Sequence, residues 1–149
     1  MRGDDGAGLE VARRVRARAP GGLEVRYCPL GRGLIEALSA AHGGVLIIDA
    51  MRTKGGGIAP GTIRRFTGAA LPRGAFASSH GFGAAQALAL AGTLGSGAKT
   101  SIYGIEGADF SHGEGLSPEV ENAVQRLSEK LMKRRGSGKP KGVFLNRGG

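Results

Sequence analysis

The chain has 149 residues, of which 40% are hydrophobic, with no Trp and a single Cys. This length suits one domain with a single core, and a lone Cys28 excludes an intrachain disulfide and a cysteine-rich zinc site. No apolar run reaches the ~20 residues of a membrane span, and the first residues lack the apolar stretch of a signal peptide. We therefore expect a cytoplasmic protein without a membrane partner.

The net charge of +9 is unevenly distributed along the chain. Residues 130–149 contain seven basic residues and no acid, and without those seven only 14 basic and 12 acidic residues remain. We interpret the charge as a solvated terminus and expect no nucleic-acid partner.

The first half of the chain predicts alternating helices and strands. Asp4 and Asp5 precede a helical stretch that ends before Pro20. A strand is expected at 23–28, a helix at 34–41, and a buried strand at 45–48 that ends in Asp49.

The second half continues the alternation. An edge strand is expected at 62–66, a helix at 83–94 and a buried strand at 101–105. Ser117-Pro118-Glu119 is typical of a helix start, and an apolar stripe at helical spacing follows it through Leu131. We assign residues 1–135 to one domain and 136–149 to a basic, disordered tail whose deletion should shift the thermal midpoint by only a few degrees.

This alternation predicts an α/β fold with a three-layer arrangement, in which a mostly parallel, twisted sheet has helices on both faces. In such folds the strand before the first helix lies near the middle of the sheet. Here the sequence opens directly on the loop before that helix, at Asp4 and Asp5. We therefore expect the first strand to be absent. The apolar edge of Val45–Ile48 would then be open, and the chain poorly soluble or inactive.

Three polar positions are expected at one edge of this sheet. Asp49 follows a strand, Asp5 would follow the absent strand, and His80 lies in the loop before the helix at 83–94. Ligands gather beyond the carboxyl ends of parallel strands, and two carboxylates with an imidazole can hold a divalent metal with open positions. Each residue also has a structural explanation, since Asp commonly caps helices and turns and a loop His is commonly solvated.

Six short motifs occur along the chain. They are Arg2-Gly3-Asp4-Asp5-Gly6-Ala7-Gly8, Leu46-Ile47-Ile48-Asp49-Ala50, Pro60-Gly61-Thr62, Ser78-Ser79-His80-Gly81-Phe82-Gly83, Tyr103-Gly104-Ile105-Glu106 and Gly115-Leu116-Ser117-Pro118-Glu119-Val120. In their order and spacing, these motifs resemble those of the hydrogenase maturation proteases.

The resemblance implies a phosphorylase/hydrolase-like fold and an endopeptidase of aspartic or metal-dependent type. Such an enzyme removes the C-terminal extension of the nickel-loaded large subunit of a nickel–iron hydrogenase, and that precursor is its partner. It also implies that Asp5, Asp49 and His80 are both the catalytic and the metal-contacting residues, and that the divalent metal is nickel carried by the substrate. Family members begin with an apolar strand ending in Gly-Asn before the D-D-G segment, which is absent here.

Two alternatives to this function are a non-catalytic Rossmann-like module that binds a metal or nucleotide, and an inactive truncated homologue. The sequence has no phosphate-binding glycine motif to support the first of these.

Overall fold

The structure of the chain is a computed structural model. It describes residues 3–18, 24–28, 32–40, 44–53, 55–67, 100–111, 113, 115–133 and 140–146. The elements are a 3₁₀ helix η1 (Gly3–Gly6), helices α1 (Ala7–Arg18), α2 (Arg32–Ala40) and α4 (Pro118–Lys133), and strands β1 (Glu24–Cys28), β2 (Gly44–Met51), β3 (Ile63–Thr67), β4 (Thr100–Glu106) and β5 (Pro140–Asn146). The helix expected at 83–94 lies outside the described residues.

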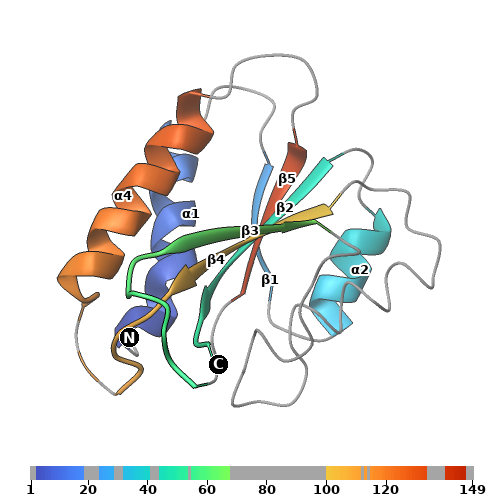
Figure 1. Ribbon diagram of the computed structural model, residues 1–149. Helices are drawn as coiled ribbons and strands as arrows, with labels where there is room; N and C mark the ends of the chain where they lie inside the picture. Colours follow the sequence, from blue (N-terminus) through green and yellow to red (C-terminus); the bar gives the residue numbers. More distant parts are fainter. Residues whose placement is uncertain are drawn as a thin grey trace.

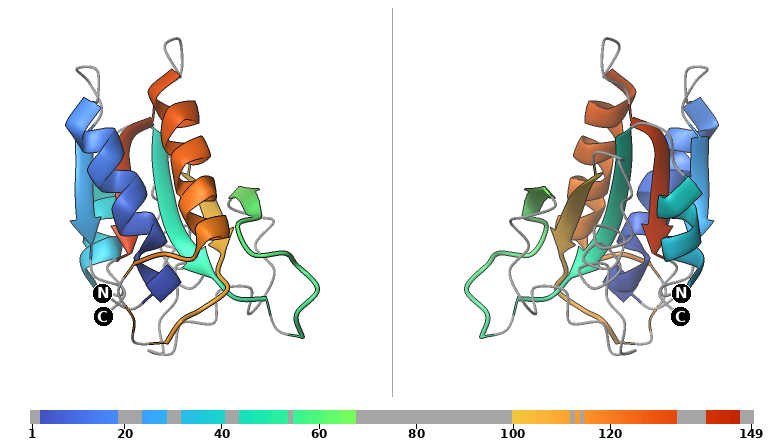
Figure 2. Two further views of the ribbon diagram at one scale, coloured as in Figure 1. Left: turned by 90° about the vertical axis from the view of Figure 1, so that its left-hand side faces the viewer. Right: turned by 90° about the vertical axis from the view of Figure 1, so that its right-hand side faces the viewer.

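The described strands form one sheet in the order β1-β5-β2-β4-β3. The pairs β1–β5, β5–β2 and β2–β4 are parallel, while β3 pairs with β4 in the antiparallel direction. Helices flank this sheet, with α1 and α4 on one side and α2 on the other (Figures 1 and 2). The expected mixed α/β class is therefore confirmed, and β3 lies at an edge of the described sheet, as expected for the strand at 62–66.

The position of β5 corrects two expectations. Residues 140–146, which we assigned to a disordered tail, form a strand between β1 and β2. β2 consequently pairs with β4 along one edge and with β5 along the other, from Leu46↔Val143 to Ile48↔Leu145. The apolar edge that we expected to be open beside Val45–Ile48 is therefore occupied by the C-terminal strand β5.

The core lies between the sheet and the pair α1 and α4. The buried side chains of this cluster come from both helices and from alternate positions of β2 and β4, such as Leu46, Ile48, Tyr103 and Ile105. Alternation arises because successive strand residues point to opposite faces. Asp49 has the opposite parity to Ile48, so its side chain lies on the sheet face away from α1 and α4.

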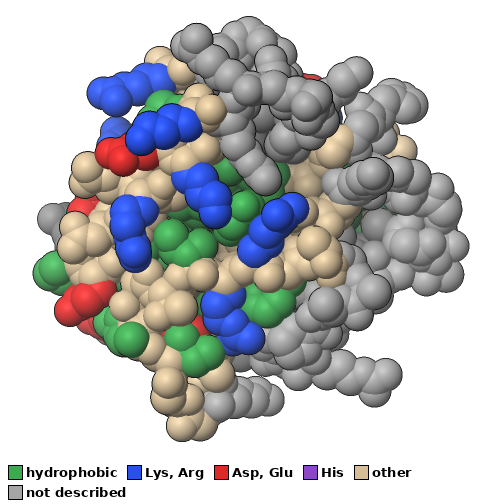
Figure 3. All heavy atoms as spheres, turned by 45° about the horizontal axis from the view of Figure 1, so that its top comes forward, with side chains coloured by type: hydrophobic (Ala, Val, Ile, Leu, Met, Phe, Trp, Pro, Cys, Tyr) green, Lys and Arg blue, Asp and Glu red, His purple; other side chains and the backbone are tan. Residues whose placement is uncertain are grey.

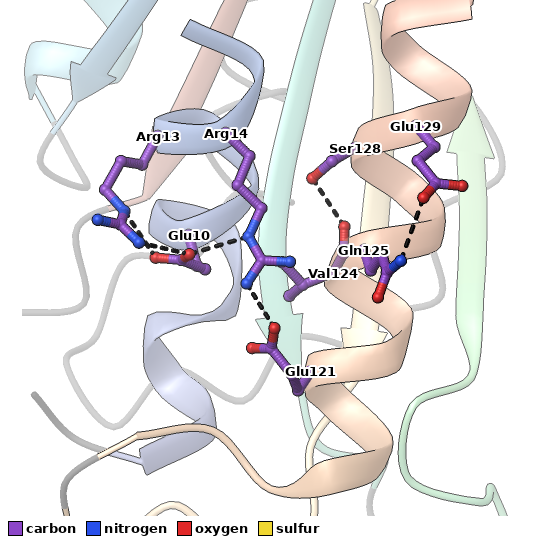
Figure 4. Close-up of polar contacts among 8 residues, drawn as sticks. All are labelled: Glu10, Arg13, Arg14, Glu121, Val124, Gln125, Ser128 and Glu129. Carbon is purple, nitrogen blue, oxygen red and sulfur yellow. Dashed lines mark hydrogen bonds and ion pairs between the residues drawn. The ribbon is translucent and has the colours of Figure 1, made fainter. Parts of the chain in front are cut away.

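Polar contacts also join α1 to α4 (Figure 4). Arg14 donates to Glu10 in its own helix and to Glu121 of α4. Ser128, which is only 2% exposed, donates to the carbonyl of Val124 one turn earlier. The Arg14–Glu121 contact and the apolar side chains that both helices bury together hold the two helices together, whereas the Ser128 bond lies within α4. Among the described residues, no helix is long and apolar enough to cross a membrane.

Candidate active site

The candidate site lies at the edge of the sheet where the parallel strands end. β2 and β5 both end at the side of the sheet where η1 and α1 begin (Figure 1). The loops that leave β2 and β4 start from this same edge. In open α/β sheets this is the edge at which ligands bind.

Asp49 lies within β2 near its end. We expected the strand to stop at Ile48, but it continues to Met51. The Asp49 side chain is 7% exposed, and its Oδ1 accepts a hydrogen bond of 2.9 Å from the N–H of Ala50. The strand and this bond together restrict the orientation of the carboxylate.

Asp5 lies in η1, which contacts β2, and its side chain is partly buried. The next turn of the chain packs very closely on the strand at Gly8. A Cβ added to Gly8 would lie 2.5 Å from the carbonyl oxygen of Ile48 and 3.3 Å from the Cα of Asp49. Only a glycine allows this approach. The start of α1, which follows Asp5 directly, is therefore held against the part of β2 that carries Asp49.

His80 lies outside the described residues, so its approach to Asp5 and Asp49 stays a prediction. Within the described ranges, no group of three or more His, Cys, Asp or Glu side chains could hold a metal ion. The structure therefore brings the Asp5 and Asp49 segments to one edge and leaves the complete metal set untested.

Asp4 has a role at this edge that the sequence did not reveal. We treated it as a cap of the helix that follows. Its side chain is fully buried and instead accepts hydrogen bonds from residues 108, 109 and 117. Ser117 directly precedes α4, so Asp4 bonds to the cap position of the last helix and not to its own. The pair of adjacent acids at positions 4 and 5 was the only sequence feature that indicated a special role here. The sequence of the pair does not show which acid is buried and which is accessible.

Glu106 is a second buried acid at this edge that we did not predict as a site residue. It ends β4, is 4% exposed, and accepts bonds of 2.8 Å from the N–H and 2.9 Å from the hydroxyl of Thr53. Those bonds fix the start of the loop that leaves β2. The rule applied to Asp49, an acid at the end of an apolar strand, would have found it.

A groove among the described residues lies elsewhere. It has a volume of about 420 Å³ and is lined by the second halves of α1 and α4, including Arg14, Arg18, Gln125 and Met132. These helix halves point to the opposite edge of the sheet (Figure 1). Figure 3 turns that edge toward the viewer and shows Lys and Arg side chains spaced apart rather than gathered in one patch. We place the chemistry at the carboxyl edge because the buried acids and the strand ends lie there.

Comparisons with known proteins give a matching family model and several similar solved structures. The HycI family model, described as hydrogenase maturation protease, matches residues 30–134, a range that includes Asp49 and His80 but not Asp5. None of the curated proteins searched matches the chain.

Several solved structures share the fold. The hydrogenase 3 maturation protease is 21% identical with a TM-score of 0.66, covering 97% of this chain and 88% of its own. The endopeptidase HycI from Escherichia coli is 20% identical with a TM-score of 0.65, covering 93% and 86%. The NiFe hydrogenase maturation protease HybD from Thermococcus kodakarensis is 24% identical with a TM-score of 0.59, covering 89% and 93%.

Proposed function

This chain belongs to the hydrogenase maturation protease family, and from that premise we propose which bond it cleaves and with which residues. The family identifies it as a hydrogenase maturation endopeptidase and does not favour the Rossmann-like binding module or the inactive homologue. Its proposed substrate is the precursor of the large subunit of a nickel–iron hydrogenase, from which it removes the C-terminal extension. The proposed place of action is the cytoplasm.

One observation carries the assignment of the site. Gly8 packs on the backbone of Ile48 and Asp49, so the segment that contains Asp5 meets β2 at its carboxyl end. A peptide that enters this edge would meet the Asp49 carboxylate, whose orientation is restricted by the N–H of Ala50. Such a carboxylate can accept a proton from a water or ligate a cation.

The residues proposed for the site fit the nickel ion that the substrate carries. Carboxylate oxygens from Asp5 and Asp49 and an imidazole nitrogen from His80 form a donor set that suits nickel and related divalent ions. A divalent ion bound there would polarise the scissile carbonyl or activate a water. In this proposal the three side chains recognise the nickel of the loaded precursor and bring the extension to the carboxyl edge. The enzyme is of aspartic type if Asp49 accepts a proton from the attacking water, and of metal-dependent type if Asp49 binds the cation.

The proposal is tested by incubating the purified chain with a hydrogenase large-subunit precursor, in nickel-loaded and nickel-free form. We expect the loaded precursor alone to lose its extension, which is measured by mass spectrometry of both products. Asp49→Asn should lower the rate at least ~100-fold, the usual size of a lost acid–base contribution.

Glu129→Gln is the matched control, because it neutralises an exposed carboxylate of α4 at the opposite edge of the sheet. It should cleave like the original chain. The proposal is wrong if the folded chain releases no extension from the loaded precursor, or if Asp49→Asn cleaves as fast as Glu129→Gln.

A further inference from the structure

The Asp4 carboxylate is completely buried and fully engaged in hydrogen bonds. Its Oδ2 accepts from the N–H of Ala108 at 2.7 Å, the N–H of Asp109 at 2.9 Å and the hydroxyl of Ser117 at 2.9 Å. Its Oδ1 accepts from the N–H of Ser117 at 2.7 Å. A buried carboxylate requires such partners because it has lost its water. Asp4 therefore has no exposed oxygen with which to contact a substrate.

The main chain around Asp4 is attached to the same loop. The N–H of Asp4 donates to the carbonyl of Asp109 at 2.8 Å, and the N–H of Gly3 donates to the carbonyl of Gly113 at 3.3 Å. Gly107 packs so closely that an added Cβ would lie 3.1 Å from the Cβ of Asp4. Both ends of the loop between β4 and α4 are consequently joined to η1 through Asp4.

Asp5 is the next residue of the same short 3₁₀ helix. Side chains of neighbouring residues in such a helix point in different directions. When Asp4 is held in the interior by the 107–117 loop, the position of Asp5 relative to β2 is set as well. The close contact of Gly8 with the backbone of Ile48 and Asp49 holds the chain on the other side of Asp5.

We propose that Asp4 is a positioning residue for the cleavage reaction, which holds Asp5 at the carboxyl edge by joining η1 to the 107–117 loop and the start of α4. This inference rests on the proposed role of Asp5 in the site. The two acids of the D-D-G segment then have different roles. Asp4 fixes the geometry from the interior, and Asp5 faces the substrate.

The test is a double-mutant cycle in the precursor cleavage assay, made from Asp4→Asn, Asp5→Asn and the double variant. Asn at position 4 keeps the size but has one acceptor oxygen, so its amide N–H₂ faces a backbone donor. We expect Asp4→Asn to lower kcat roughly 100-fold, the loss that a displacement of ~1 Å can cause, with KM little changed. In the Asp5→Asn background the same change should have almost no further effect, because groups that act as one unit are non-additive.

A pair of serine variants separates positioning from general stability. Ser117→Ala removes the hydroxyl that donates to Asp4, and Ser128→Ala removes a buried hydroxyl of α4 that donates only to Val124. We expect Ser117→Ala to lower kcat several-fold and Ser128→Ala to leave it unchanged, when both are assayed well below their thermal midpoints.

The outcomes distinguish this inference from the proposed function. If the original chain cleaves and Asp5→Asn cleaves much more slowly but at a measurable rate, the function stands. Equal losses from Asp4→Asn in both backgrounds, or equal kcat for the two serine variants, then show that Asp4 serves stability alone. An original chain that cleaves no precursor overturns both proposals.

Discussion

Deleting residues 140–149 should unfold the domain, although the sequence alone suggested a dispensable tail. The matched control is deletion of residues 147–149, which leaves β5 intact. β5 lies between β1 and β2 in the sheet, so its loss removes two interfaces at once. It also leaves β1 without a partner among the described strands.

The size of the effect follows from the register. β5 pairs with five residues of β1, from Glu24↔Gly142 to Cys28↔Asn146, and with five of β2, from Gly44↔Pro140 to Ile48↔Leu145. A central strand of this length makes on the order of ten ladder hydrogen bonds, each with a net contribution of ~0.5–1.5 kcal/mol. Their sum is on the order of 10 kcal/mol before any apolar burial is counted. That equals the whole stability of an ordinary domain.

The assay is urea denaturation followed by far-ultraviolet circular dichroism. We expect the 140–149 deletion to lack a cooperative transition and the 147–149 deletion to match the full chain. Val143→Pro gives an independent measure, because it removes one ladder N–H from a central strand, and it should lower the free energy of unfolding by at least ~3 kcal/mol. If the long deletion keeps the full chain's urea midpoint, β5 contributes nothing to the sheet and the tail interpretation was right.

Two further predictions concern α1. Gly8→Ala should destabilise the fold by ~1–3 kcal/mol, because the added methyl group would overpack against the carbonyl of Ile48, although Ala normally stabilises a helix. The control in the same urea titration is Gly113→Ala, where the added methyl group has no atom within 4 Å. The pKa of Glu10 is lowered chiefly by a hydrogen bond from Arg13, so its contribution to stability is present above its unfolded pKa and is lost as pH falls through the lower, folded one. Glu10→Gln should therefore flatten the loss of stability between neutral and acid pH, and an unchanged slope would contradict this.

Much of the fold could be predicted from local patterns. The apolar run at 45–48 predicted β2, and the stripe through Leu131 predicted α4, because burial on one or both faces leaves a periodic trace in the sequence. The cap at Ser117-Pro118 located the start of α4 correctly. The edge strand expected at 62–66 is β3, which lies at an edge of the described sheet.

β5 could not be predicted in the same way. Its sequence, Pro-Lys-Gly-Val-Phe-Leu-Asn, has one Pro and one Gly and follows a basic, glycine-rich stretch, so its local preference for a strand is weak. Its place in the sheet favours a strand. Without β5, the backbone N–H and C=O groups of β1 and β2 that face each other across the gap would lack partners. That requirement comes from the rest of the fold, and within the segment only the short apolar run Val143-Phe144-Leu145 indicates that it could pack on the domain.

The two acids at positions 4 and 5 show the same limit at the site. Asp is a common N-cap, and local rules therefore assigned Asp4 to the helix that follows it. Its carboxylate is bound instead to donors more than a hundred residues away. Those N–H groups belong to the loop that follows β4, and buried N–H groups need an acceptor, which Asp4 supplies. Once one carboxylate is committed to them, its neighbour is the one left at the surface of the carboxyl edge, partly buried and next to β2. In the roles that we propose for the D-D-G segment, contacts with the 107–117 loop determine which acid is structural. The local sequence of the segment does not show those contacts.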